Sequence, residues 1–173
     1  MLEKLKLEEF DQVYEIMVDN FISDEYRNYE EQKDLLKNPL YKVYVVKERN
    51  EIITFIAIWE FDDFIYFEHL ATKKEKHNLG IGTKVINYIT KSESKNIVLE
   101  VEEPIDEIEK RRIEFYKRNG FVMNEYDYVQ PPMSKGKNFV PLRIMSTKKI
   151  NNKNEFETIK ETLYKNVYKF TEK

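Results

Sequence analysis

Two glycines separated by one residue are the strongest chemical signal in this 173-residue sequence. The chain has only four glycines, and two of them stand in the segment His77-Asn78-Leu79-Gly80-Ile81-Gly82-Thr83, between a predicted strand and a predicted helix. The N-terminus of a helix exposes unpaired backbone N–H groups and carries a partial positive charge. Glycines there let the backbone come close to an anion, so the spacing indicates a phosphate-binding turn.

Two well-known phosphate motifs do not fit this turn. The dinucleotide-binding fingerprint needs a third glycine where this sequence has Val85. The P-loop needs a Gly-Lys-Ser/Thr ending, whereas Gly82-Thr83-Lys84 has the last two residues in the reverse order. The alternative is a tight strand-to-helix turn that uses glycine only for its backbone freedom. The glycine spacing alone does not decide between the two.

The elements that would hold this turn change type near residue 80. Alternating and apolar runs predict strands before it at 1–6, 41–47, 52–59 and 64–72, with helices at 8–21 and 29–37. The polar and aromatic segment 22–28 between these helices indicates a mobile loop. After residue 80 we expect helices at 80–92, 107–119 and 155–170 and strands at 96–101, 121–129 and 140–146. This order predicts an α/β protein of the α+β type, with a mixed, mostly antiparallel central sheet of about six to seven strands and helices on both faces.

The composition excludes several classes of function. Without cysteine the chain has no disulfide, thiolate nucleophile or cysteine-type zinc site, and its two histidines, His69 and His77, leave little for a metal site. The net charge of −3 argues against generic nucleic-acid binding. No run approaches the ~18 apolar residues of a membrane span, and no signal-peptide profile follows Met1. We therefore expect a cytoplasmic protein that needs no metal, nucleic acid or membrane.

The stretch from Glu68 to Gly82 resembles the acetyl-coenzyme A (acetyl-CoA) signature of the GNAT-type N-acetyltransferases. That signature has Arg or Gln, two residues, Gly, one residue, then Gly or Ala; here the spacing matches and His77 stands in the Arg/Gln position. A second stretch, Phe115-Tyr116-Lys117-Arg118-Asn119-Gly120-Phe121, resembles the family's tyrosine followed after three residues by Gly-Phe. Taken alone, its glycine and tyrosine would be a helix-ending residue and a core side chain.

The resemblance implies the acyl-CoA N-acyltransferase fold of the family, with residues 1–150 as the acetyltransferase domain and residues 151–173 as a C-terminal helix packed on it. It also implies acetyl-CoA as co-substrate. Amides of the glycine turn would hold its pyrophosphate, and those of the preceding strand would hold its pantetheine arm and polarise the thioester. The cofactor-binding residues implied in this way are Leu70, Ala71, Thr72, His77, Asn78, Leu79, Gly80, Ile81, Gly82 and Thr83.

Direct acetyl transfer to an amine requires loss of a proton from the amine, a donor for the developing oxyanion and a proton for the departing thiolate. The resemblance assigns the last role to Tyr116. The first candidate for the proton acceptor is Glu68, acting directly or through water, and the second is His69. As strand neighbours these two should face opposite ways unless a bulge intervenes. Glu100 and Glu102 are further alternatives.

The sequence therefore favours an N-acetyltransferase that acts on an amine of a small molecule or a peptide. One alternative is an acyl-CoA-binding module of the same fold without turnover, which is favoured by two departures from the family pattern, His77 and Glu109 (in the place of an Asn), and opposed by Tyr116. The other alternative is a structural domain whose glycines only turn the chain. We expect the acceptor to depend on segments 22–28 and 131–138, and an exposed strand or the last helix offers a surface for a homodimer.

Overall fold

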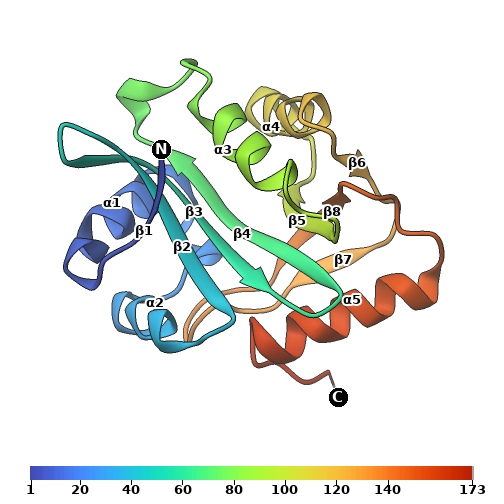
Figure 1. Ribbon diagram of the computed structural model, residues 1–173. Helices are drawn as coiled ribbons and strands as arrows, with labels where there is room; N and C mark the ends of the chain where they lie inside the picture. The colour runs from blue at the N-terminus through green and yellow to red at the C-terminus, as the bar shows by residue number, and fades with distance from the viewer. Residues whose placement is uncertain (173) are drawn as a thin grey trace. The chain divides into compact units, whose positions relative to one another are not determined.

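Residues 1–172, which a computed structural model describes, form eight β-strands and five α-helices (Figure 1). They fall into two compact units, Met1–Ile97 and Val98–Lys173. Lys173, the last residue of the predicted C-terminal helical segment, lies outside the described residues.

The first unit is built on an antiparallel meander. β1 (Leu2–Lys4) pairs with β2 (Tyr41–Glu48), β2 with β3 (Glu51–Glu60), and β3 with β4 (Phe64–Thr72). The sequence predicts the last three strands to within one residue at each end, because charged turns bound each apolar run. Every residue from Ile52 to Trp59 is buried, so β3 is covered on both faces, as its unbroken apolar run indicates.

Three helices complete the first unit. α1 (Phe10–Asn20) and α3 (Ile81–Thr90) both pack on β3 and β4. α2 (Tyr29–Asp34) continues into a 3-10 turn, Leu35–Lys37, before β2. Each helix lies within the range that the periodicity predicts. α3 follows β4 after only a short connection, which places the glycine turn at its N-terminus.

The second unit contains the remaining elements, except for the first two residues of β5. β8 (Val140–Ser146) pairs antiparallel with β5 (Asn96–Glu102), β6 (Val122–Met123) and β7 (Tyr128–Gln130). Its helices are α4 (Glu107–Arg118), which packs near β6, and α5 (Lys153–Asn166). The predicted α+β class with mostly antiparallel pairing is confirmed.

Two predicted elements differ in the structure. The single strand expected over 121–129 is two short strands, β6 and β7, which is one reason why eight strands form instead of six or seven. β6 ends beside buried Asn124, whose backbone amide and side chain both donate to the Ile144 carbonyl and whose side-chain oxygen accepts from the Ile150 amide. Between Met123, which pairs with Met145, and Tyr128, which pairs with Leu142, the register with β8 shifts by two residues. The last helix ends at Asn166, not near residue 170, since the amide of Phe170 turns back to the Tyr164 carbonyl at 2.8 Å.

Candidate functional site

The glycine turn between β4 and α3 uses a left-handed backbone. Gly80 has φ +77° and Asn78 has φ +65°, a conformation that glycine and asparagine tolerate best. A Cβ built at Gly80 would meet nothing within 4 Å. The glycine is therefore needed for its backbone angle, and the space beside the turn is open.

The turn presents backbone donors. The amides of residues 78–83 donate no hydrogen bond within residues 1–172, and no side chain caps α3. His77 braces the turn, because its Nε2 donates to the Thr72 carbonyl at 2.8 Å and so ties the turn to the end of β4. Several free N–H groups at the positive end of a helix form the arrangement that binds phosphate. The residues present thus fit the pyrophosphate of acetyl-CoA.

The end of β4 is rigidly held in the sheet. Leu70, Ala71 and Thr72 pair with residues 56, 55 and 54 of β3, and the Thr72 hydroxyl lies 2.9 Å from that of Thr54. These three residues lead without interruption through residues 73–77 into the glycine turn. The structure therefore brings the sequence-predicted strand and turn residues together in one continuous stretch.

A β-bulge lies at Glu68. Ala57 pairs with His69 and Ile58 with Phe67, so Glu68 is the extra residue of β4. The bulge places the Glu68 Oε2 3.3 Å from the His69 Nδ1, although neighbouring side chains on a regular strand point to opposite faces. The bulge that the sequence left open is therefore present, and it makes Glu68 and His69 one cluster.

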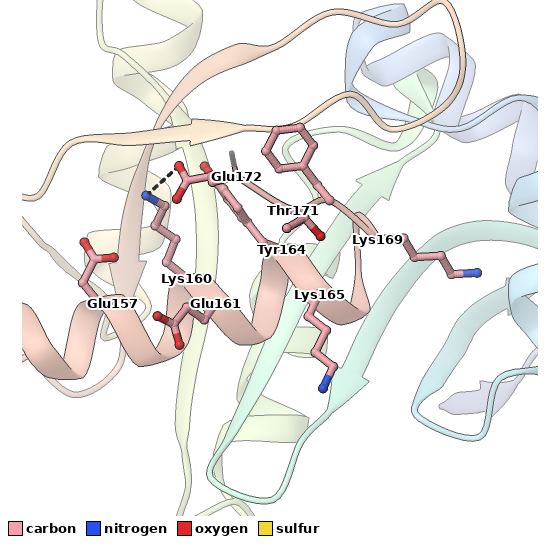
Figure 2. A pocket seen from close by; sticks show the side chains of 9 residues that line it. Glu157, Lys160, Glu161, Tyr164, Lys165, Lys169, Thr171 and Glu172 are labelled. Carbon is pink, nitrogen blue, oxygen red and sulfur yellow. Dashed lines mark ion pairs between the residues drawn. The ribbon is translucent and has the colours of Figure 1, made fainter.

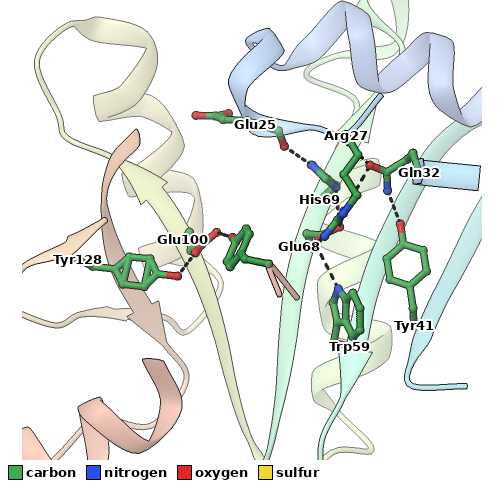
Figure 3. Close-up of polar contacts among 10 residues, drawn as sticks. Glu25, Arg27, Gln32, Tyr41, Trp59, Glu68, His69, Glu100 and Tyr128 are labelled. Carbon is green, nitrogen blue, oxygen red and sulfur yellow. Dashed lines mark hydrogen bonds and ion pairs between the residues drawn. The ribbon is translucent and has the colours of Figure 1, made fainter. Parts of the chain in front are cut away.

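Arg27 binds this cluster from a distant part of the chain (Figure 3). Its two terminal nitrogens lie 3.0 and 2.8 Å from the two carboxylate oxygens of Glu68, and the two side chains are 5% and 1% exposed. The Trp59 indole donates a third hydrogen bond at 3.2 Å. Burial alone would raise the pKa of the Glu68 carboxyl, but the charge of Arg27 and the contact with His69 hold that pKa well below its ordinary value.

The same contacts anchor segment 22–28. His69 Nε2 donates to the Glu25 carbonyl at 2.7 Å, and Gln32 accepts hydrogen bonds from the amide and guanidinium of Arg27 (Figure 3). Segment 22–28 is therefore pinned to β4, whereas its composition indicated a mobile loop. Arg27 is the residue that sequence reasoning missed, because it meets Glu68 from 41 positions away and no local spacing reveals the pair.

Tyr116 lies on the last turn of α4, in the second unit. Its ring packs against Phe115 and Phe121, with centroids 5.2 and 5.6 Å away. Its hydroxyl makes no hydrogen bond within residues 1–172. Burial raises the pKa of Tyr116, and the charge of Arg112 opposes that rise, so the phenol keeps its proton at neutral pH. Gly120 ends the helix with φ +94°.

The other carboxylates singled out in the sequence have partners in the second unit. Glu109 completes a capping box at the start of α4, where its side chain accepts from the Asp106 amide at 3.3 Å. Glu102 lies 3.4 Å from Arg112. Glu100 accepts hydrogen bonds from the hydroxyls of Tyr128 and Tyr168 (the first shown in Figure 3), and burial with the charge of Glu100 raises the pKa of Tyr128.

A hollow of about 620 Å³ lies between α5 and residues 169–172 (Figure 2). An ion pair of 3.3 Å between Lys160 and Glu172 spans it, and carboxylates and ammonium groups mix along its walls. It therefore presents no single sign of charge. Among residues 1–172, no cluster of three or more His, Cys, Asp or Glu is suited to a metal ion, and no helix has the length and apolar character of a membrane span.

In the first unit, a meander with a bulged fourth strand leads into an uncapped glycine turn at the start of a helix. The family model described as an acetyltransferase (GNAT) domain matches residues 39–123. A solved structure described as a GNAT-family acetyltransferase from Bacteroides thetaiotaomicron is 31% identical, with 99% of each chain covered and a TM-score of 0.89. The chain belongs to the GNAT acetyltransferase family.

Two more distant structures share the fold. Arabidopsis thaliana NAA60 in complex with acetyl-CoA is 15% identical over 84% of this chain and 96% of its own, with a TM-score of 0.65. A mutant of the spermidine N-acetyltransferase SpeG from Vibrio cholerae is 16% identical over 84% and 93%, with a TM-score of 0.64. A comparison with curated proteins found no match.

Proposed function

We propose that this chain transfers the acetyl group of acetyl-CoA directly to an amine of a small molecule or a peptide. The observation that carries the proposal is the row of free amides at residues 78–83, at the N-terminus of α3 and directly after a bulged β4. Two structural neighbours favour an amine acceptor, since one is a spermidine N-acetyltransferase and NAA60 has also been solved with a bisubstrate analogue.

Acetyl-CoA supplies an acetyl group activated as a thioester. In the proposal, the backbone amides of residues 78–83 bind the diphosphate, and because they carry no ionisable group they bind alike across pH. The amide of His77 donates to the Lys74 carbonyl at 3.2 Å, so His77 contributes by holding the turn. Amides of Leu70, Ala71 and Thr72 direct the pantetheine arm and polarise the carbonyl. Tyr116 gives its proton to the thiolate as the nitrogen–carbon bond forms and the carbon–sulfur bond breaks. Its hydroxyl is protonated over the whole neutral range and therefore has a proton to give.

Removal of the amine proton is the second part of the proposal. Glu68 is held in a buried ion pair that keeps its pKa low, and a carboxylate with a low pKa is a weak base. This setting favours the route through water over direct transfer to Glu68. The Nε2 of His69 donates a hydrogen bond to the Glu25 carbonyl, and its Nδ1 lies 3.3 Å from the Glu68 carboxylate. We propose that a water molecule accepts the amine proton as the nitrogen–carbon bond forms, and that the Glu68 carboxylate, kept ionised by Arg27, stabilises the positive charge that this water gains.

The test is release of free thiol from acetyl-CoA in the presence of an amine panel that includes polyamines and peptides with a free N-terminus. Tyr116→Phe removes only the hydroxyl and keeps the ring contacts, so kcat should fall by about 100-fold while the affinity for acetyl-CoA stays unchanged. Tyr126→Phe is the matched control. That ring is stacked on Phe156 in the same unit, and its hydroxyl also makes no hydrogen bond within residues 1–172.

Equal rates for the wild type and Tyr116→Phe would remove the tyrosine from the acid role. Binding of acetyl-CoA without thiol release for any amine would instead identify an acyl-CoA-binding module without turnover. The buried engagement of both Glu68 and His69 is the observation that favours that second function.

A further inference from the structure

α2 buries a glutamine that the proposed chemistry does not use. Gln32 is 0% exposed, and it is the one buried residue of this six-residue helix, which the structure describes in full. A buried side-chain amide needs partners for both its oxygen and its nitrogen, because an unpaired polar group in the interior is costly. The partners of Gln32 therefore indicate what it holds in place.

The Gln32 oxygen binds both ends of Arg27. Its Oε1 accepts a hydrogen bond from the Arg27 backbone amide at 3.1 Å and another from Arg27 Nη1 at 3.4 Å. On the other side of the amide, Nε2 donates to the Tyr41 hydroxyl of β2 at 3.0 Å, as Figure 3 shows. The amide has only one orientation here, because arginine N–H groups donate and never accept, so the oxygen must face them. Gln32 thus ties Arg27 to the sheet.

The same guanidinium holds the Glu68 carboxylate at the bulge of β4. Arg27 Nη1 lies 3.0 Å from Oε2 and Nη2 lies 2.8 Å from Oε1, the two-point geometry in which an arginine fork binds a carboxylate strongly. Arg27 Nη1 is therefore shared between Gln32 and Glu68. A long arginine side chain loses rotamer freedom in any single pose. The contacts to Gln32, one at the main chain and one at the tip, hold Arg27 in the pose that its pair with Glu68 needs.

We propose that Gln32 is a positioning residue for acetyl transfer, which directs the fork of Arg27 at Glu68 and so holds the carboxylate in the place and charge state that removal of the amine proton requires. The proposal rests on the proposed function, in which Glu68 stabilises the charge of the accepting water. Gln32 acts through Arg27 and not on a reacting atom. A side chain of α2 thereby sets the charge at the bulge of a strand that precedes the glycine turn.

Three other titratable groups stand near this pair: His69 on β4, Glu25 two positions before Arg27, and Tyr41 on β2. Burial and the charge of Glu68 raise the pKa of Tyr41, so its phenol stays protonated. The buried residues of α1 are all apolar, and β3 contributes the Trp59 indole, which does not titrate. A carboxyl group introduced at position 32 would therefore act on the Arg27–Glu68 pair in the first place.

The first test is Gln32→Met, which keeps the length of the side chain and removes its hydrogen bonds. With thiol release measured at saturating acetyl-CoA and amine, kcat should fall by about tenfold while the KM for acetyl-CoA stays unchanged. Gln12→Met is the matched control. Half-buried Gln12 on α1 accepts a hydrogen bond from the Ile52 amide at 3.0 Å in the same unit, so its loss affects the fold and leaves kcat unchanged.

The second test is the pH profile of Gln32→Glu. A protonated carboxyl group copies the glutamine, since its carbonyl accepts from Arg27 and its hydroxyl donates to Tyr41. An ionised one competes with Glu68 for the single guanidinium, and burial beside Glu68 raises the pKa of the new carboxyl. The ratio of variant to wild-type kcat, in which the titration of the amine cancels, should be close to one near pH 5.5 and should fall about tenfold toward pH 8.5. Gln12→Glu should show a flat ratio.

The third test needs no turnover. Arginine N–H groups that are buried at fixed acceptors exchange slowly with water, so NMR of the wild type should show resolved signals for the Arg27 guanidinium. Gln32→Met should broaden or merge them, and Gln12→Met should leave them as they are.

Three results would overturn the positioning role and leave the proposed function standing: equal kcat for the wild type and Gln32→Met, a flat pH ratio for Gln32→Glu, or equal losses of kcat in the Gln32 and Gln12 variants. Unchanged Arg27 signals in Gln32→Met would overturn the contact on which the role depends. A wild type that releases no thiol with any amine would overturn the proposed function and this role together.

Discussion

At the residue scale, the buried ion pair of Glu68 with Arg27 stabilises the fold and also lowers the pKa of the Glu68 carboxyl. An isolated carboxylate with 1% exposure would favour its neutral form, yet two hydrogen bonds from Arg27 and one from Trp59 keep it ionised. Because the folded pKa lies below the unfolded one, the carboxylate stabilises the protein above the unfolded pKa. That contribution is lost as pH falls toward the folded pKa.

Glu68→Gln should lower the free energy of unfolding by about 3–5 kcal/mol at pH 7, since it leaves the Arg27 charge buried without a counter-ion. Below about pH 4.5 the wild type should lose stability by up to 1.36 kcal/mol per pH unit through this group, and the variant should lack that part of the slope. Urea unfolding from pH 3 to 7 measures both effects.

Glu60→Gln is the control for this measurement. Glu60 pairs with Lys42 at 2.7 Å, but its side chain is 36% exposed, so the loss should stay below about 1 kcal/mol. A Glu68 variant that behaves like the Glu60 variant would show that the Arg27 pair contributes little. Replacing both partners by apolar residues, as in Arg27→Met with Glu68→Leu, should recover much of the stability that the single change removes.

At the scale of elements, Asn124 stands where β6 ends and a loop begins in the second unit. Its side-chain amide donates to the Ile144 carbonyl at 3.2 Å and to the Ser146 hydroxyl at 2.9 Å, and its oxygen accepts from the Ile150 amide at 3.0 Å. The residue is 1% exposed. Its backbone amide also donates to the Ile144 carbonyl at 3.0 Å, and its side chain joins β6, β8 and the start of the segment that leads to α5.

Asn124→Ala should therefore reduce the free energy of unfolding by about 2–3 kcal/mol, because it leaves the buried Ile150 amide without its partner. Asn166→Ala serves as comparison. That side chain donates only to the Thr162 carbonyl of its own helix, so its removal should change stability by about 0.5 kcal/mol or less. Chemical denaturation of both variants gives the two values, and similar losses would show that the buried amide does not hold this junction.

The elements also show which parts of the structure a sequence can predict. β4 matches its predicted range because an apolar run bounded by charged residues is local information. The split of strand 121–129 has no such signal, since the aromatic residues around Asn124 satisfy a strand pattern and the partners that break it lie at 144–150. The Arg27–Glu68 pair cannot be predicted from local sequence either, because its two residues lie 41 positions apart. The glycine turn is predicted from its short spacing, and the role of Tyr116 is implied by a motif that resembles the family's.

For the molecule as a whole, the glycine turn predicts that ligand binding and stability are linked. Acetyl-CoA at 100 times its dissociation constant should raise the free energy of unfolding by about 2.7 kcal/mol. Trp59, the only tryptophan in the chain, is fully buried in the unit that carries the turn, so its fluorescence reports this unfolding. No change in the wild type would remove acetyl-CoA from the proposal.

Gly80→Ala and Gly136→Ala distinguish a ligand-binding turn from a turn that only redirects the chain. Both glycines have positive φ, +77° and +87°, and neither has an atom within 4 Å of an added Cβ, so the two changes impose a similar backbone strain of about 1–2 kcal/mol. Gly136→Ala should keep the full stabilisation by acetyl-CoA, because it lies in the loop before β8. Gly80→Ala should lose most of it, since relaxing the strain turns the free amides away from the diphosphate. Equal stabilisation of the two variants would mean that residues 78–83 do not hold the ligand.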